Sequence, residues 1–318
     1  MRVVVTGGAG FIGGNLCRHL LAMADVDEVV VLDNLVTGNA ANIADLPVRF
    51  VERSILDDDA LDEACSGADA IVHLAALGSV PRSVADPMAS HLNNTTGTAL
   101  VLEAARRHGN LHTIVASSSS VYGSNPILPK HEDLATRPMS PYAATKLATE
   151  AYALAWGNSF DLPVLAFRFF NVFGPLQPAG HVYAAVIPAF VDAALAGRPL
   201  IVHGDGEQSR DFTYVGTVST VLADAVVRRV TSQGPVNLAF GSRVRLLDVI
   251  AAIEAILGHP VERHHSERRA GDVPHSQADS ARLLSLFPGV KPVPFDEGLR
   301  ATIDWMRTTR EAGPQEHS

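Results

Sequence analysis

The sequence has few cysteines, few aromatic side chains and no apolar run as long as a membrane span. Its two cysteines, Cys17 and Cys65, form no CxxC pair, so no disulfide framework is expected. No signal peptide precedes the strand-like residues 2–5, and a cytoplasmic protein without a membrane partner is expected. The net charge of −9 argues against nucleic acid and anionic membranes as partners. His264, His265 and His275 have no carboxylate or cysteine partner at ligand spacing, so no metal site is expected.

Short β-branched runs alternate with helical stretches through the first half of the chain. Strands are predicted at residues 3–5, 29–32, 48–51, 70–74, 113–116 and 164–170. Helices are predicted at residues 11–23, 57–65, 87–108 and 142–160. Continuous apolar strands that alternate with helices are typical of a doubly wound parallel sheet, which is an α/β fold of the Rossmann type.

The pattern changes after Gly174-Pro175, where proline and glycine recur and the regular alternation ends. We therefore predict a nucleotide-binding domain over residues 1–174 and a smaller C-terminal lobe over residues 175–310 that mainly binds substrate. The chain is expected to return to the first domain around residues 212–240. Residues 311–318 are expected to form a tail.

A glycine cluster follows the first predicted strand and opens the first predicted helix. Glycines at 7, 10 and 13 allow a tight turn, a close approach to a pyrophosphate and close packing of helix on strand. Asp33, twenty residues after Gly13, ends the second predicted strand. Its carboxylate can accept hydrogen bonds from the adenosine ribose and would repel a 2′-phosphate. This arrangement predicts a dinucleotide site that prefers NAD to NADP.

Tyr142 and Lys146 are four residues apart and share one face of a predicted helix. A phenol ionises only near pH 10, and a neighbouring ammonium favours the phenolate form that acts as a general base. A run of serines at 117–120 ends the fifth predicted strand and can supply a hydroxyl that bonds the same substrate oxygen. Spacing alone thus predicts a hydride-transfer site.

These motifs resemble the extended short-chain dehydrogenases. The resemblance rests on two motifs, Thr6-Gly-x-x-Gly-x-x-Gly13 and Tyr142-x-x-x-Lys146. It rests also on the segments 33–38, 73–76 and 169–174 and on a second glycine-rich stretch at residues 204–212. Within that family the chain is most similar to UDP-hexose 4-epimerases that prefer UDP-N-acetylglucosamine, on the evidence of residues 78–83, Gln177, 183–188 and 275–279. The resemblance covers residues 1 to about 307.

The resemblance implies NAD as cofactor and assigns three catalytic residues, Ser118, Tyr142 and Lys146. It implies that NAD contacts Gly7, Gly10, Phe11, Ile12, Gly13, Asp33, Asn34, Thr37, Gly38, Ser54, Ile55, Leu74, Ala75, Ala76, Asn93, Tyr142, Lys146 and Phe169. It implies that a UDP-sugar contacts Gly78, Ser79, Ser118, Ser119, Ser120, Tyr142, Asn171, Gln177, Ala185, Val186, Ile201, His203, Arg210, Arg269, Asp272 and Ser276.

The resemblance implies that Asn171, Arg210 and Arg269 hold the diphosphate of the UDP-sugar. It also implies that Ile201 and His203 border the uracil. Ser276 occupies a position where a small side chain leaves room for an N-acetyl group. The chain departs from the family at Ser54, where an aspartate usually contacts adenine, so Ser54, Asp57 or a water is expected to take that role.

Three other activities fit the motifs less well. A UDP-glucuronate 4-epimerase would use an arginine such as Arg82, but that group more often has threonine at the position of Asn171. A nucleotide-sugar dehydratase would carry acidic residues where this chain has Ser119 and Ser120. A catalytically inactive regulator would have lost one of the three catalytic residues. The resemblance also implies a homodimer in which residues 87–108 and 142–158 form a four-helix bundle.

Overall fold

The computed structural model describes residues 1–179, 184–267 and 274–311. Its centre is a seven-stranded sheet with the order β11-β6-β5-β4-β1-β2-β3, in which every neighbouring pair is parallel. The strands are β1 (Arg2–Thr6), β2 (Glu28–Leu32), β3 (Arg49–Val51), β4 (Ala70–His73), β5 (His112–Ser118), β6 (Val164–Phe169) and β11 (Val236–Leu238). The predicted doubly wound parallel sheet is confirmed.

Helices cover both faces of this sheet because successive strand residues point to opposite faces. On one face, Val3 and Val5 pack in an apolar cluster with α1 (Phe11–Leu21), α8 (Val215–Val227) and α10 (Ala281–Leu286). On the other face, Val4 and Ile71 pack with α2 (Asp58–Cys65), α5 (Gly97–Arg107) and α6 (Pro141–Phe160). The strands are therefore buried on both sides, which explains their continuous apolar sequences.

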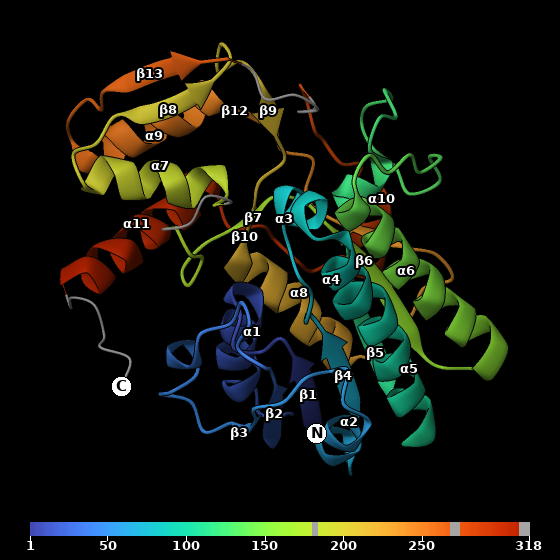
Figure 1. Cartoon of the computed structure of the whole chain (residues 1–318). Coiled ribbons are helices and arrows are strands. Elements are labelled where there is room, and N and C mark those ends of the chain that lie inside the picture. Colours follow the sequence, from blue (N-terminus) through green and yellow to red (C-terminus); the bar gives the residue numbers. More distant parts are fainter. Residues whose placement is uncertain (180–183, 268–273, 312–318) are drawn as a thin grey trace.

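A second group of elements lies beyond the carboxyl edge of the sheet, at the upper left in Figure 1. It contains α7 (Val186–Leu195), β8 (Leu200–His203), α9 (Leu246–Leu257) and α11 (Phe295–Glu311), which share a third apolar cluster. The exposed strand β13 (Arg263–Ser266) pairs with β8. Between the two groups the chain forms β7 (Val172–Phe173), β9 (Ser209–Arg210), β10 (Thr213–Tyr214) and β12 (Val244–Arg245). The division at residue 174 stays a prediction, and β11 and α8 show that later residues complete the large sheet and its cover.

The helix predicted at residues 87–108 is interrupted. α3 (Val80–Ala85) and α4 (Pro87–His91) lead into a π-helical turn, Leu92–Thr96, before α5 begins. The carbonyl oxygen of Asn94 accepts hydrogen bonds from the hydroxyls of Thr98 at 2.5 Å and Thr149 at 3.3 Å. These hydroxyls occupy the acceptor that the α-helical backbone bond would use, so the turn widens.

No helix among the described residues combines the length and the apolar character that a membrane span requires.

Candidate active site

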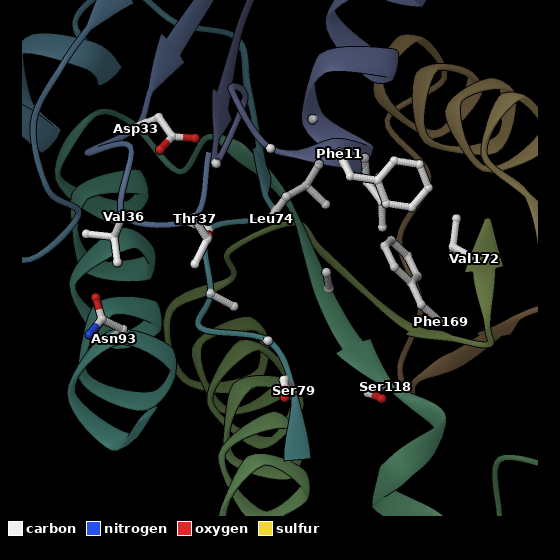
Figure 2. A pocket seen from close by; sticks show the side chains of 18 of the residues that line it. Phe11, Asp33, Val36, Thr37, Leu74, Ser79, Asn93, Ser118, Phe169 and Val172 are labelled. Carbon is white, nitrogen blue, oxygen red and sulfur yellow. The ribbon is translucent and has the colours of Figure 1, made fainter. Parts of the chain in front are cut away.

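A cavity of about 780 Å³ opens where β1, β2, β4, β5 and β6 end. Ligands of doubly wound sheets bind at this edge because the loops that follow parallel strands converge there. Figure 2 shows Asp33 at one end of the cavity, with Ser79 and Ser118 at the other. The two ends of the predicted site therefore belong to one continuous space.

The glycine loop lines the cavity through Gly7, Gly10 and Gly13. Gly7 has a φ of 73°, and a Cβ on Gly13 would lie 2.2 Å from the carbonyl oxygen of Gly7. Only glycine tolerates that contact. α1 starts after Gly10 without a capping side chain, so the N–H groups of its first turn remain for an anionic ligand. The loop is a cradle that fits the pyrophosphate of a dinucleotide.

Asp33 is buried at the end of β2 and faces this loop. Its carboxylate accepts hydrogen bonds from the backbone N–H of Ala9 at 3.0 Å and of Leu35 at 2.9 Å. Burial raises the pKa of Asp33, and the two backbone bonds act in the opposite direction. A fixed carboxylate of this kind accepts hydrogen bonds from ribose hydroxyls and disfavours a phosphate in their place.

The end of the cavity opposite Asp33, called the catalytic end below, contains the three predicted catalytic residues Ser118, Tyr142 and Lys146. α6 begins at Pro141 with Ser140 as its N-cap, so Tyr142 and Lys146 lie one turn apart on the face that packs against β5. Lys146 Nζ donates to the carbonyl oxygen of Ala116 at 2.7 Å. Among the described residues this is its one acceptor, so further N–H donors remain for the hydroxyls of a ribose.

Burial sets the electrostatics at this end. It lowers the pKa of Lys146 to about 8. It raises the pKa of Tyr142, whereas a hydrogen bond with Ser118 acts to lower it. Ser118 Oγ accepts from the backbone N–H of Ser120 at 3.2 Å, which leaves the Ser118 hydroxyl proton to donate to an oxygen anion. The trio can therefore remove and return a proton at a substrate hydroxyl.

Most residues predicted to contact the cofactor line this cavity. They are Gly7, Gly10, Phe11, Ile12, Gly13, Asp33, Asn34, Thr37, Ile55, Leu74, Ala75, Ala76, Asn93, Tyr142, Lys146 and Phe169. Gly38 and Ser54 do not line it. Gly38 packs against the Asp33 carboxylate, and Ser54 Oγ accepts from the N–H of Leu56 at 3.1 Å.

The residues predicted to contact the substrate fall into two groups. Those in the cavity are Gly78, Ser79, Ser118, Tyr142, Asn171, Gln177 and Ala185. Those outside its lining are Ser119, Ser120, Val186, Ile201, His203, Arg210 and Ser276. Arg269 and Asp272 lie outside the described residues. The contacts of all these residues with ligands stay predictions.

Arg210, in β9, and Ser276 both contact the carbonyl oxygen of Ser209, although 65 residues separate them in the sequence. A bridge joins Ser209 to His275, and the N–H of Ser276 donates to the carbonyl oxygen of Ser209 at 3.1 Å. Arg210 Nη1 donates to the carbonyl oxygens of Ser209 at 2.9 Å and Pro274 at 3.3 Å. A bridge between distant segments, which the sequence pattern did not reveal, thus brings Arg210, predicted to hold the diphosphate, near Ser276, predicted to leave room for an N-acetyl group.

Asp211, which the sequence analysis passed over, organises this region. The side chain is fully buried, and its carboxylate accepts from the N–H groups of Gly241, Ser242 and Ala278 and from the Ser242 hydroxyl at 2.9–3.1 Å. It thereby joins β9 to two distant loops. In a sequence, an acidic residue next to an arginine is usually interpreted as a pair of surface charges. Only the fold shows that Asp211 is buried and links these segments.

Two arginines also line the cavity and were not predicted as ligands of the favoured substrate. Arg53 follows β3 and forms an ion pair with Asp57, which caps α2 through the N–H of Ala60. These contacts occupy the Asp57 carboxylate. Asp57, one of the groups expected to contact adenine, does not line the cavity. Arg82 lies three residues after Ser79, near the catalytic end.

The histidines noted in the sequence bond to protein partners. His264 contacts Glu262, His265 contacts the carbonyl oxygen of Gly204, and His275 contacts Ser209 Oγ at 2.9 Å. Across residues 1–179, 184–267 and 274–311 no group of three or more His, Cys, Asp or Glu side chains could hold a metal ion.

Comparisons with known proteins agree with this geometry. The model of the NAD dependent epimerase/dehydratase family matches residues 3–239. The curated UDP-glucose 4-epimerase of Mycolicibacterium smegmatis is 36% identical over 319 residues, covering 96% of this chain and 99% of that protein.

Two solved structures are similar over almost their whole length. UDP-N-acetylglucosamine 4-epimerase from Methanobrevibacter ruminantium, in complex with UDP-N-acetylmuramic acid, has a TM-score of 0.91 and 36% identity and covers 97% of this chain and 98% of its own. UDP-glucuronic acid 4-epimerase from Bacillus cereus, in complex with UDP-glucuronic acid and NAD, has a TM-score of 0.89 and 30% identity over 97% of this chain and 100% of its own.

The substitution Gly13→Ala should abolish dinucleotide binding and lower the melting temperature, because the new methyl group would overlap the Gly7 carbonyl oxygen at 2.2 Å. Gly289→Ala is the matched control, since nothing lies within 4 Å of its added Cβ. Bound dinucleotide per chain and thermal unfolding measure the effect. A Gly13→Ala protein that retains full dinucleotide content would contradict the cradle.

Proposed function

The chain belongs to the NAD-dependent epimerase/dehydratase family, and from this premise we propose that it inverts the C4 hydroxyl of a UDP-sugar. The proposed preferred pair is UDP-N-acetylglucosamine and UDP-N-acetylgalactosamine. NAD is the cofactor. The observation that carries the proposal is that Ser118, Tyr142 and Lys146 line the same cavity as the glycine cradle and Asp33.

Bound NAD supplies a hydride acceptor and donor for the sugar carbon. Tyr142 takes the proton from the C4 hydroxyl, and Ser118 donates a hydrogen bond to the same oxygen as charge develops there. Lys146 favours the phenolate by its positive charge and offers its remaining donors to a ribose. Tyr142 returns the proton when the 4-keto sugar is reduced from its other face. Net oxidation is zero, so one cofactor serves repeated turnovers.

The predicted substrate residues fall into one group inside the cavity and one outside its lining. This division suits a sugar that must rotate to present its other face while its nucleotide stays bound. We propose that Arg210, Arg269 and Asn171 hold the diphosphate, with Asp272 on the uridine ribose and Ile201 and His203 beside the uracil. An arginine fork binds phosphate through charge-assisted hydrogen bonds. The sugar would then lie among the small and polar side chains of the catalytic end.

Small side chains at the sugar end support an N-acetylated substrate. Gly78, Ser79 and Ala185 line the cavity, and Ser276 lies on the segment beside β9. A bulky residue at these positions would fill the volume that an acetamido group requires. Space of this kind permits a larger substrate and discriminates by only about 1–3 kcal/mol, so both N-acetylated and plain hexoses can react. The similarity to the Methanobrevibacter ruminantium enzyme supports the same choice.

UDP-glucuronate is the second candidate substrate, because Arg82 lines the cavity and forms no hydrogen bond or ion pair through its side chain with another described residue. A sugar carboxylate would satisfy that guanidinium. A 4,6-dehydratase is less well supported, because elimination of water needs an acid where this chain has Ser119 and Ser120.

We also propose a homodimer formed through the helices on one side of the large sheet. Met88 on α4 is 62% exposed, Leu92 on the π-helical turn 46%, and Tyr152 and Phe160 on α6 are 38% and 44% exposed. A second copy packed against these helices would bury the apolar side chains, as in the predicted four-helix bundle.

The purified protein should interconvert UDP-N-acetylglucosamine and UDP-N-acetylgalactosamine without added NAD. Nuclear magnetic resonance of equilibrated mixtures measures this, with UDP-glucose and UDP-glucuronate tested in parallel. A higher kcat/KM for UDP-glucuronate would favour the second candidate. Release of a 4-keto-6-deoxy sugar would replace epimerisation by dehydration.

Tyr142→Phe should lower kcat by about 10²–10⁴-fold, because the variant lacks the group that moves the proton. NAD content should be unchanged, since the ring still fills its place in the cavity wall. Steady-state kinetics together with the amount of bound dinucleotide test both statements. Near-normal turnover by the variant would refute the assignment of the base.

The rate should fall as the pH rises above about 8, because burial lowers the pKa of Lys146 to about 8 and its ammonium is lost there. Below that pH Lys146 is charged and favours the phenolate; above it the neutral amine does not. Lys146→Arg, which stays charged, should be slower but lose the alkaline fall. A pH profile of kcat/KM that remains level for the unchanged enzyme up to about pH 10, the ordinary range of lysine, would contradict this prediction.

A further inference from the structure

A buried ion pair lies next to the catalytic trio, between α6 and β6. Arg168 Nη2 and Nε donate to the two carboxylate oxygens of Glu150 at 2.6 Å and 2.9 Å, and the side chains are only 4% and 5% exposed. Two parallel bonds fix the direction as well as the distance between the groups. The pair therefore sets how α6 lies on the sheet.

The same carboxylate reaches β5 through Ser117. Ser117 Oγ lies 2.9 Å from Glu150 Oε2 and 3.0 Å from the carbonyl oxygen of Lys146, and these two acceptors share its single hydroxyl proton. Ser117 is also the partner of Arg168 in the pairing of β5 with β6. Glu150 thus bonds groups on two strands while it stands on the catalytic helix.

Each contact point is adjacent to a residue of the active site. Ser117 precedes Ser118, Glu150 follows Lys146 by one helical turn, and Arg168 precedes Phe169, which lines the cavity. A shift of α6 along β5 would separate Tyr142 from the Ser118 hydroxyl. The ion pair opposes that shift at the place where it would matter for proton transfer.

Arg168 is held from its far side as well. Its Nη1 donates to the carbonyl oxygen of Glu132 at 3.1 Å, and its guanidinium carbon lies 4.7 Å from the centre of the Tyr122 ring. Buried ion pairs add little net stability, because desolvation of the charges offsets their attraction, and apolar residues of similar volume replace them well. What an apolar pair cannot reproduce is the fixed orientation.

We propose that Glu150 and Arg168 are positioning residues for catalysis: through Ser117 they hold α6 and β5 in the alignment that joins the Ser118 hydroxyl to Tyr142. This rests on the proposed epimerase function for its kinetic consequence. The consequence for Tyr142 ionisation is independent of that function, because a displaced Ser118 no longer donates to the phenolate.

Two variants test the proposal. Arg168→Lys keeps the charge and removes the two-pronged bond; Glu150→Leu combined with Arg168→Met removes both charges and keeps the volume. Both should fold and retain NAD, with kcat lowered ~10- to 100-fold by misalignment and KM changed less than twofold. Asp224→Asn with Arg228→Gln, which removes a partly exposed pair at the C-terminal end of α8, is the control and should match the unchanged protein in kcat and in the pKa of Tyr142.

A substrate-free readout accompanies the kinetics. The ionisation of Tyr142 is measured as tyrosinate absorbance against pH. The titration of the same protein with Tyr142→Phe added is subtracted, which removes the other tyrosines, including Tyr122 beside Arg168. The pKa of Tyr142 should rise in both variants. If folded, NAD-loaded variants keep the kcat and the Tyr142 pKa of the unchanged protein, the positioning function is wrong. If the double variant does not fold, Arg168→Lys decides alone. If the unchanged protein converts no UDP-sugar, the proposed function fails, while the titration still tests the positioning.

Discussion

The contact of α6 with the carboxyl end of β5 is the interaction on which the active site depends. Lys146 Nζ reaches the carbonyl oxygen of Ala116, and Ser117 Oγ reaches the carbonyl oxygen of Lys146, so helix and strand bond to each other in both directions. This contact brings Tyr142 to Ser118. Neither residue could act on the same substrate oxygen if the helix were displaced by a fraction of a turn.

Exclusion of water at this contact also sets the chemistry. Burial disfavours the charged forms of both Tyr142 and Lys146, which raises one pKa and lowers the other. The ordinary pKa values of the two groups are nearly equal, 10.0 for the phenol and 10.5 for the ammonium, so burial moves them apart and makes Lys146 the more acidic group. The hydrogen bond with Ser118 acts against the effect of burial on Tyr142 and favours its phenolate form.

A second centre of organisation is Asp211, which joins β9 to the loops that contain Ser242 and Ala278. Arg210 and Ser276 are neighbours because of this junction and the bridge between Ser209 and His275. The catalytic end and the region proposed to hold the nucleotide are built from different parts of the chain. Their separation suits the proposed reaction, in which the nucleotide would stay bound while the sugar presents first one face and then the other.

The sequence by itself determined the features that depend on near neighbours. The glycine loop with Asp33 requires only a strand, a turn and a helix, and Tyr142 and Lys146 require only a helical period. The parallel sheet was predicted correctly, and these residues line one cavity, while their contacts with ligands stay predictions.

Only the tertiary structure decided the features that depend on contacts between distant segments. The π-helical turn arises because hydroxyls of α5 and α6 compete for the Asn94 carbonyl, and Asp211 and Arg168 find partners 18 to 67 residues away. Ser119 and Ser120 lie outside the cavity lining because the chain turns into a 3-10 helix directly after Ser118. The spacing of residues along one helix or strand does not encode such contacts, because they depend on which strands and helices are neighbours in the folded chain.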